Sequence, residues 1–166
     1  MFDPFWQLLQ DSRIATAIRE GELLFPWIEC FHVLALSVVV GSIAFVDLRL
    51  IGVAARDRSV AQTTRSVLPV TWSAFIAAVI TGGLLFSSNA TMYAHNIYFQ
   101  VKIGLIVAAG ANMSLYHLFL DRGSELWTTA ERTPLRARLT GVVSLGLWVT
   151  IVACGRWIGF TINALS

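Results

Sequence analysis

The chain has 166 residues, of which 56% are hydrophobic and only 13% are charged, and its mean hydropathy is +0.69. A soluble domain carries about 25% charged residues, so the composition predicts an integral membrane protein. The net charge of +2 gives no reason to expect a nucleic-acid partner. The two cysteines, Cys30 and Cys154, cannot form a disulfide framework.

Residues 1–22 form the first predicted element. They lack the basic start and apolar core of a cleavable signal peptide, and their apolar residues recur at helical spacing between polar ones. Asp3 followed by Pro4 is typical of a helix start. We expect an amphipathic helix that lies on the outer surface of the bilayer or caps a site at the outer mouth of the bundle.

Four apolar runs follow, each near the roughly 20 residues that a transmembrane helix needs. They cover about 24–47, 67–88, 99–120 and 140–163. Pro69 falls in the first turn of the second run, and Gly155 and Gly159 predict a small-residue packing face in the fourth. The sequence therefore predicts one domain over 1–166, an all-α four-helix membrane bundle.

Orientation follows from the basic residues, which cytoplasmic loops retain. Eight of the twelve basic residues flank or lie within the loops that follow the first and third runs: Arg49, Arg56, Arg58, Arg65, Arg122, Arg132, Arg136 and Arg138. The loop at 88–98 and the tail after Gly159 contain none. We expect both termini on the outer side.

Ionisable residues inside the runs are the first candidates for a functional site, because charges in hydrocarbon are costly. A rise of about 1.5 Å per residue places Glu29 and His32 roughly 8 and 12 Å below the outer boundary. On the same measure Lys102 lies roughly 6 Å and Arg156 roughly 13 Å below it. These four residues predict one polar site in the outer third of the membrane.

Other polar residues in the runs have plainer explanations. Asp47 is expected to pair locally with Arg49 at the cytoplasmic end of the first run, with a second functional site there as the alternative. Asn112 is expected to form an interhelical hydrogen bond. His95 lies in the outer loop, where it is a weak candidate for a ligand. His117 lies about 28 Å below the outer boundary, too far from His32 to share a haem with it within one subunit.

Three interpretations of the outer site remain open. In the first, Glu29 pairs with Arg156 or Lys102, His32 is a hydrogen-bonded core residue, and the cluster only fixes packing. In the second, His32 ligates the iron of haem b or hydrogen-bonds a quinone, while Lys102 and Arg156 bind anionic groups. Only His95 could then supply a second haem ligand.

The third interpretation is a metal or proton route. Glu29-x-x-His32 has the i, i+3 spacing of helix-borne metal ligands. Cys30 and Cys154 lie at a similar depth, and thiolates favour Cu(I). Catalytic motifs of hydrolases and nucleotide-binding loops are absent from the sequence, so no class of enzyme is predicted.

The run Trp27-Ile28-Glu29-Cys30-Phe31-His32, followed by Asp47-Leu48-Arg49-Leu50-Ile51-Gly52, resembles an uncharacterised family of small bacterial four-span inner-membrane proteins. Phe99-x-x-Lys102, Asn112, His117 and Gly155-Arg156 are similar to later motifs of that family. The resemblance implies a bacterial inner membrane but supplies no activity. The four-span architecture with intramembrane histidines also resembles cytochrome b561-type and copper-resistance membrane proteins.

We therefore expect a small membrane redox component that binds haem b or a quinone at the outer site. His32 would be the ligand or hydrogen-bond partner, with Glu29 as its orienting group. A structural or accessory subunit is the alternative. Expected partners are membrane lipid and a homo-oligomer or larger membrane complex.

Overall fold

Seven helices make up the chain in the computed structural model, which describes residues 3–54, 59–116, 118 and 133–163. They are α1 (Asp3–Gln10), α2 (Arg13–Glu20), α3 (Leu24–Ile51), α4 (Val60–Ser88), α5 (Ala90–His95), α6 (Ile97–Leu115) and α7 (Leu135–Asn163). The described residues contain no strand. Helices α3, α4, α6 and α7 are long and apolar enough to cross a membrane, so the protein is an all-α four-helix membrane bundle.

Local capping groups set the helix ends. Ser59 begins α4 by accepting a hydrogen bond from the backbone N–H of Gln62 at 3.1 Å. Asn96 begins α6 in the same way, with the N–H groups of Tyr98 and Phe99 as donors. Gly52 ends α3 with φ 91°, a left-handed conformation that glycine adopts without steric cost. These caps extend α3 and α4 beyond the apolar runs.

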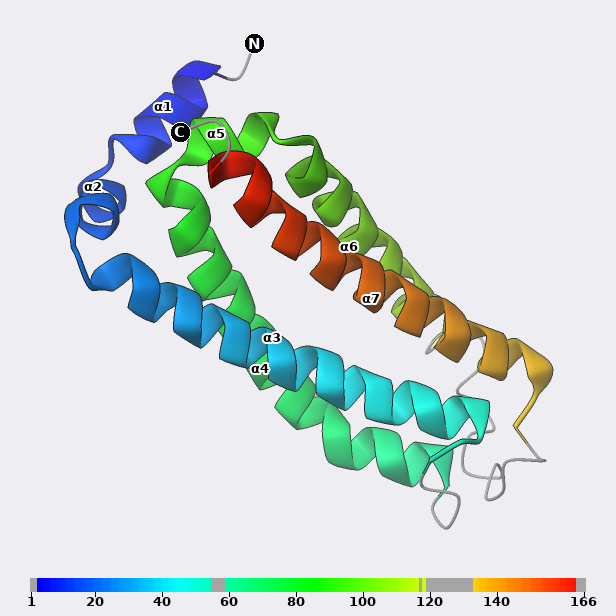
Figure 1. Ribbon diagram of the computed structural model, residues 1–166. Helices are drawn as coiled ribbons and strands as arrows, with labels where there is room; N and C mark the ends of the chain where they lie inside the picture. The colour runs from blue at the N-terminus through cyan, green and yellow to red at the C-terminus, as the bar shows by residue number, and fades with distance from the viewer. Residues whose placement is uncertain (1–2, 55–58, 117, 119–132, 164–166) are drawn as a thin grey trace.

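The long helices pack as two pairs joined along one seam. Helix α3 packs along α4, α6 packs along α7, and α3 also contacts α7 (Figure 1). Helices α4 and α6 are not among the closely packed pairs in the described part of the chain. The central core is the cluster of Val39, Ala109, Trp148 and Ile151, which joins α3, α6 and α7.

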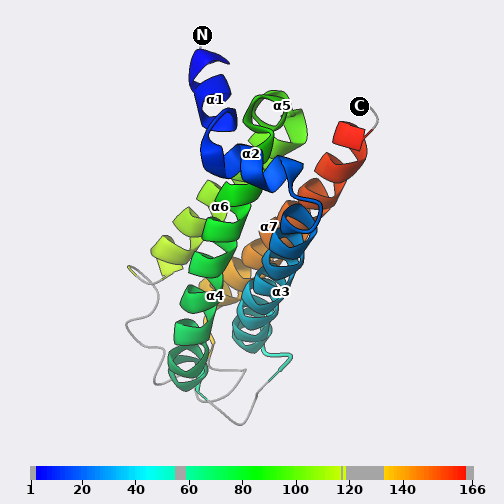
Figure 2. The same cartoon turned by 90° about the vertical axis from the view of Figure 1, so that its left-hand side faces the viewer.

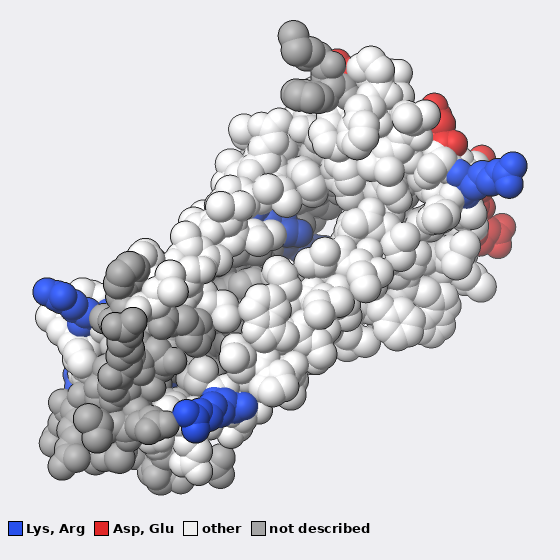
Figure 3. Space-filling model, turned by 180° about the vertical axis from the view of Figure 1, so that it is seen from behind, with Lys and Arg blue, Asp and Glu red and all other residues white. Residues whose placement is uncertain are grey.

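Large apolar side chains cover the outer faces of the four long helices. Leu34, Ile80 and Val107 are each more than half exposed, as are many of their neighbours. On the face that Figure 3 shows, charged side chains lie toward the two ends of the bundle, and the middle is uncharged apart from a basic side chain in a hollow. This distribution matches a lipid-facing belt.

Helices α1, α2 and α5 together form a cap over one end of the bundle, which we call the capped end; the opposite end is the open end (Figure 2). Arg19 of α2 donates hydrogen bonds to the backbone oxygens of Gln10, at 3.2 Å, and of Ser88, at 3.1 Å. Trp6 packs edge-on against Phe86 with ring centroids 5.5 Å apart. Both ends of the described chain lie at this end (Figure 1).

Several details differ from the sequence predictions. Residues 1–22 contain two helices, because Ser12 begins α2 with its hydroxyl accepting from the N–H of Ala15. Pro69 lies in the interior of α4 and not in its first turn, since the helix begins at Val60. A Cβ at Gly159 would meet nothing within 4 Å, so the Gly155–Gly159 motif is not a close packing face within this chain.

Candidate functional site

His32 of α3 is held against α4 at the level of Thr81 and Gly82. Its Nδ1 atom lies 3.0 Å from the hydroxyl oxygen of Thr81. The Thr81 hydroxyl donates its own proton to the carbonyl of Ala77 at 2.7 Å, so it accepts a hydrogen bond from Nδ1–H of His32. This arrangement assigns the proton of a neutral His32 to Nδ1 and leaves a lone pair on Nε2.

Gly82 allows this close approach. A Cβ at that position would lie 2.9 Å from Cε1 of His32, which is closer than side chains normally come. The adjacent Gly83 would meet nothing within 4 Å if it carried a Cβ. Of the two neighbouring glycines, therefore, only Gly82 is required by the position of the imidazole.

Lys102 of α6 reaches the same level from the opposite pair of helices. Its side chain is half-buried, and its Nζ atom lies 3.8 Å from the position that a Cβ of Gly155 would occupy. The ammonium group is near enough to act electrostatically on His32 and on Cys154. His32, Thr81, Lys102 and Cys154 thus form a group to which all four long helices contribute, and we call it the capped-end site.

Glu29 and Arg156, which the sequence places in the same site, do not join it. Both side chains are exposed. The charge of Glu29 acts on Tyr93 of α5, and the Arg156 guanidinium lies 4.7 Å from the ring centroid of Phe160. Among the described residues, no ion pair links Glu29 to Lys102 or to Arg156.

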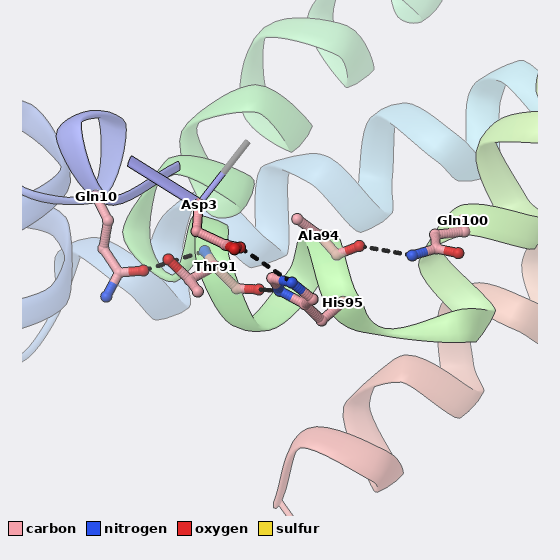
Figure 4. A network of polar contacts seen from close by, with 6 residues as sticks. All are labelled: Asp3, Gln10, Thr91, Ala94, His95 and Gln100. Atoms are coloured by element: carbon pink, nitrogen blue, oxygen red, sulfur yellow. Dashed lines mark hydrogen bonds and ion pairs between the residues drawn. The ribbon is translucent and has the colours of Figure 1, made fainter. Parts of the chain in front are cut away.

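His95 belongs to the cap and not to the site. It lies on α5, where its Nδ1 is 2.8 Å from the carbonyl oxygen of Thr91 and its Nε2 is 3.1 Å from a carboxylate oxygen of Asp3 (Figure 4). Nearby, Gln10 accepts a hydrogen bond from the Thr91 N–H at 3.2 Å. These contacts fasten α1 to α5, and they occupy both ring nitrogens of His95.

For haem iron or copper, the capped-end site offers one imidazole nitrogen and one thiol among the described residues. His32 has one free nitrogen for a metal, but His95 has none, and His117 lies outside the described residues. No group of three or more His, Cys, Asp or Glu side chains gathers as a metal site in the part of the chain that the structure describes. The donor set there is one imidazole, one ammonium and one thiol, which is suited to hydrogen bonding and proton transfer.

A second polar region lies toward the open end, around Asp47, where the sequence offers a second functional site as the alternative to a local pair with Arg49. It is a cavity of about 180 Å³ enclosed by α3, α4, α6 and α7. Its lining is mostly apolar, with these polar side chains among the described residues: Asp47, Thr64, Thr71, Asn112, Tyr116, Thr140 and Ser144. One signal was available in the sequence, namely polar residues in the inner halves of all four runs.

Asp47 and Asn112 both have partners across helices. The carboxyl group of Asp47 is hydrogen-bonded to Ser144 of α7, whereas the sequence predicted a local pair with Arg49. Residues two apart on a helix point to different sides, and Arg49 is fully buried elsewhere on α3. The Asn112 amide donates to the backbone oxygen of Thr140 at 3.1 Å, which is the expected interhelical bond.

The fold and these two regions define a small four-span membrane bundle with a helical cap. Residues 20–161 match the family of unknown function DUF6644, and the chain belongs to that family. No curated protein and no solved structure matches the chain. The family therefore agrees with the resemblance to an uncharacterised family, and a function has to be argued from the residues.

Proposed function

We propose that the protein is a membrane redox component that binds a quinone-type carrier at the capped-end site. The observation that carries the proposal is a half-buried Lys102 ammonium within electrostatic range of His32, whose imidazole is hydrogen-bonded to Thr81. Neither Glu29 nor Asp47 is paired with Lys102 in the described structure. A cation kept inside a membrane span without a carboxylate favours an oxygen-bearing ligand.

Each residue has a distinct part in such a site. Lys102 donates a hydrogen bond to an oxygen of the quinone head group. Thr81 fixes the His32 tautomer, so that Nε2 can accept a proton from a hydroxyl of the reduced carrier. Oxidation of a quinol releases two electrons and two protons; His32 accepts one proton, the other goes to water at the capped end, and the electrons go to a partner redox protein.

The same proposal includes a location. We place the protein in a bacterial inner membrane, with the capped end and both termini on the outer side. Arg65, Arg136 and Arg138 lie near the ends of α4 and α7 away from the cap, as the preference of cytoplasmic segments for basic residues requires. The capped-end site then faces the outer leaflet.

The test is binding of decylubiquinone to the detergent-purified protein, followed by the quenching of its tryptophan fluorescence. Lys102→Gln is expected to weaken binding roughly tenfold or more, because a hydrogen bond from a charged donor is lost. Arg156→Gln is the matched control, since it removes a cation at a similar depth that points away from the site. Its binding is expected to equal that of the unmodified protein.

Two results would overturn the proposal. One is a folded Lys102→Gln variant that binds decylubiquinone as well as the unmodified protein does, which would leave the cluster a structural role. The other is a Soret band with sharpened bands after dithionite reduction, which would restore haem as the ligand. Gly82→Ala provides a second variant: displacing His32 is expected to weaken binding, whereas Gly83→Ala is expected to have no effect.

A further inference from the structure

The cavity near the open end contains a buried carboxyl group that the proposed function does not use. Asp47 is only 5% exposed. Its hydrogen bond goes to Ser144, and its Oδ2 atom is buried with no hydrogen-bond partner in the described structure. Asp47 lines the cavity. An unsatisfied carboxyl oxygen in a residue that lines a cavity is costly unless a partner binds there.

The described residues that line the cavity supply no positive charge. None of these side chains is Lys, Arg or His. Asn112 uses its amide N–H on the backbone oxygen of Thr140, so its amide oxygen remains as a further acceptor. The other polar side chains of the lining are neutral and include hydroxyl groups, which can donate or accept. Asp47 therefore supplies the one carboxyl group among the described lining residues, and this group favours a cation with N–H donors.

Aromatic rings form much of the remaining wall. Trp72, Phe75 and Trp148 all line the cavity. Indole and phenyl rings attract organic cations through their faces, and Trp does so most strongly. An apolar cavity of about 150 Å³ is enough to hold benzene, so a cavity of about 180 Å³ accommodates a ligand built on one ring.

The cavity is also reachable from the lipid side of the bundle. Trp72 lines it and is 49% exposed, and Gly110 of α6 both lines it and is exposed. These two residues lie on α4 and α6, which are not among the closely packed helix pairs of the described structure. A ligand that partitions into the membrane can enter between them.

We propose that this cavity is a second binding site, separate from the capped-end site, for a small amphiphilic organic cation. The Asp47 carboxylate pairs with the ammonium group of the ligand. The amide oxygen of Asn112 accepts from it, and Trp72, Phe75 and Trp148 enclose its apolar part.

The experiment compares benzylammonium with benzyl alcohol, a neutral probe of nearly the same shape. Binding to the protein in dodecyl maltoside micelles is measured by saturation-transfer NMR of the probe. Saturable binding of benzylammonium is expected, with Asp47→Asn weakening it at least about tenfold. Asp11→Asn, the same change on an exposed residue of the cap segment, is expected to leave the affinity unchanged.

A second variant covers the case in which Asp47→Asn does not fold. Trp72→Leu removes one aromatic face at the half-exposed rim and is expected to weaken benzylammonium more than benzyl alcohol. Equal binding of benzylammonium to folded Asp47→Asn and to the unmodified protein would overturn the proposal. So would an equal effect of Trp72→Leu on both probes, since either result would indicate simple partitioning.

Discussion

At the scale of single residues, Tyr93 of the cap lies within electrostatic range of Glu29 on α3. It lies on α5, outside the membrane-spanning helices, and stacks near Phe86 and Phe99. Burial raises the pKa of its phenol, and the negative charge of Glu29 raises that pKa further. The protonation of Tyr93 therefore reports whether Glu29 faces the cap.

We predict that Glu29→Gln lowers the pKa of Tyr93 toward the ordinary tyrosine value, because it removes a negative charge that opposes ionisation. The phenol pKa is higher in the folded than in the unfolded protein. This group therefore stabilises the fold fully below the ordinary pKa, and that contribution is lost as the pH rises through the folded pKa. Glu29→Gln should narrow the alkaline pH range over which the contribution of Tyr93 to the stability of the fold is lost.

The measurement is the tyrosinate absorbance during an alkaline titration, with Tyr93→Phe used to isolate the contribution of Tyr93. Glu22→Gln, a neighbouring exposed carboxylate, is the control and should leave the titration unchanged. A Tyr93 midpoint that does not move in Glu29→Gln would show that Glu29 does not act on the cap.

The sequence predicted how deep in the membrane the candidate site residues lie, but not the direction in which their side chains point. Counting residues from the membrane boundary placed Glu29, His32, Lys102 and Arg156 at one level. A rise per residue gives no information about which side of its helix each residue faces relative to the other helices. His32 and Lys102 face the interior, whereas Glu29 and Arg156 are exposed.

At the scale of helices, the contact between α3 and α7 depends on Gly141. A Cβ at this position would lie 3.1 Å from the backbone oxygen of Asp47 and 3.3 Å from Cβ of Leu50. The close approach brings α7 to the end of α3 that carries the cavity residue Asp47. Gly146, further along α7, would have no atom within 4 Å of its Cβ.

Gly141→Ala is expected to destabilise the bundle by about 1–3 kcal/mol, because the added methyl group must push against the α3 backbone. Gly146→Ala is the matched control: it gains helix propensity, about 1 kcal/mol at most, without a contact. Thermal unfolding of the two purified variants measures the difference. Equal shifts for both would contradict the close contact between α3 and α7.

Helix ends were harder to predict than helix identity. The apolar runs identified the four spans, because about 20 residues without charge have few alternatives. Helix α4, however, continues through polar residues such as Gln62 and Ser66 to its cap at Ser59. Hydropathy does not report such turns, because exposed polar residues lie there between buried ones such as Val60 and Thr63.

At the scale of the whole molecule, both chain ends and the cap lie at the same end of the bundle (Figure 1). Acidic side chains gather at one end of the visible face in Figure 3, and basic ones are prominent at the other. An even number of spans places both termini on the same side of the membrane. This part of the topology therefore follows from the count of spans alone.

We predict that alkaline phosphatase fused to the C-terminus will be active in bacterial cells, because the positive-inside preference places that end outside. Green fluorescent protein fused at the same position should not fluoresce. The control is a fusion after Gly52, at the open end of α3, where the two reporters should behave in the opposite way. An inactive phosphatase fusion together with a fluorescent green fluorescent protein fusion at the C-terminus would indicate the opposite orientation.

The arrangement of helix pairs also has a mechanical consequence. The four long helices form two arms. One arm is α3 with α4, the other is α6 with α7, and the two arms meet where α3 contacts α7. Near the chain ends, Arg19 ties α2 to the end of α4, and α5 leads directly into α6. At the other end Leu50, Val60, Tyr116 and Ala137 pack into a second buried cluster that joins the two arms, so hinge-like spreading around Asp47 has to break the contacts of this cluster while the cap holds the chain ends together.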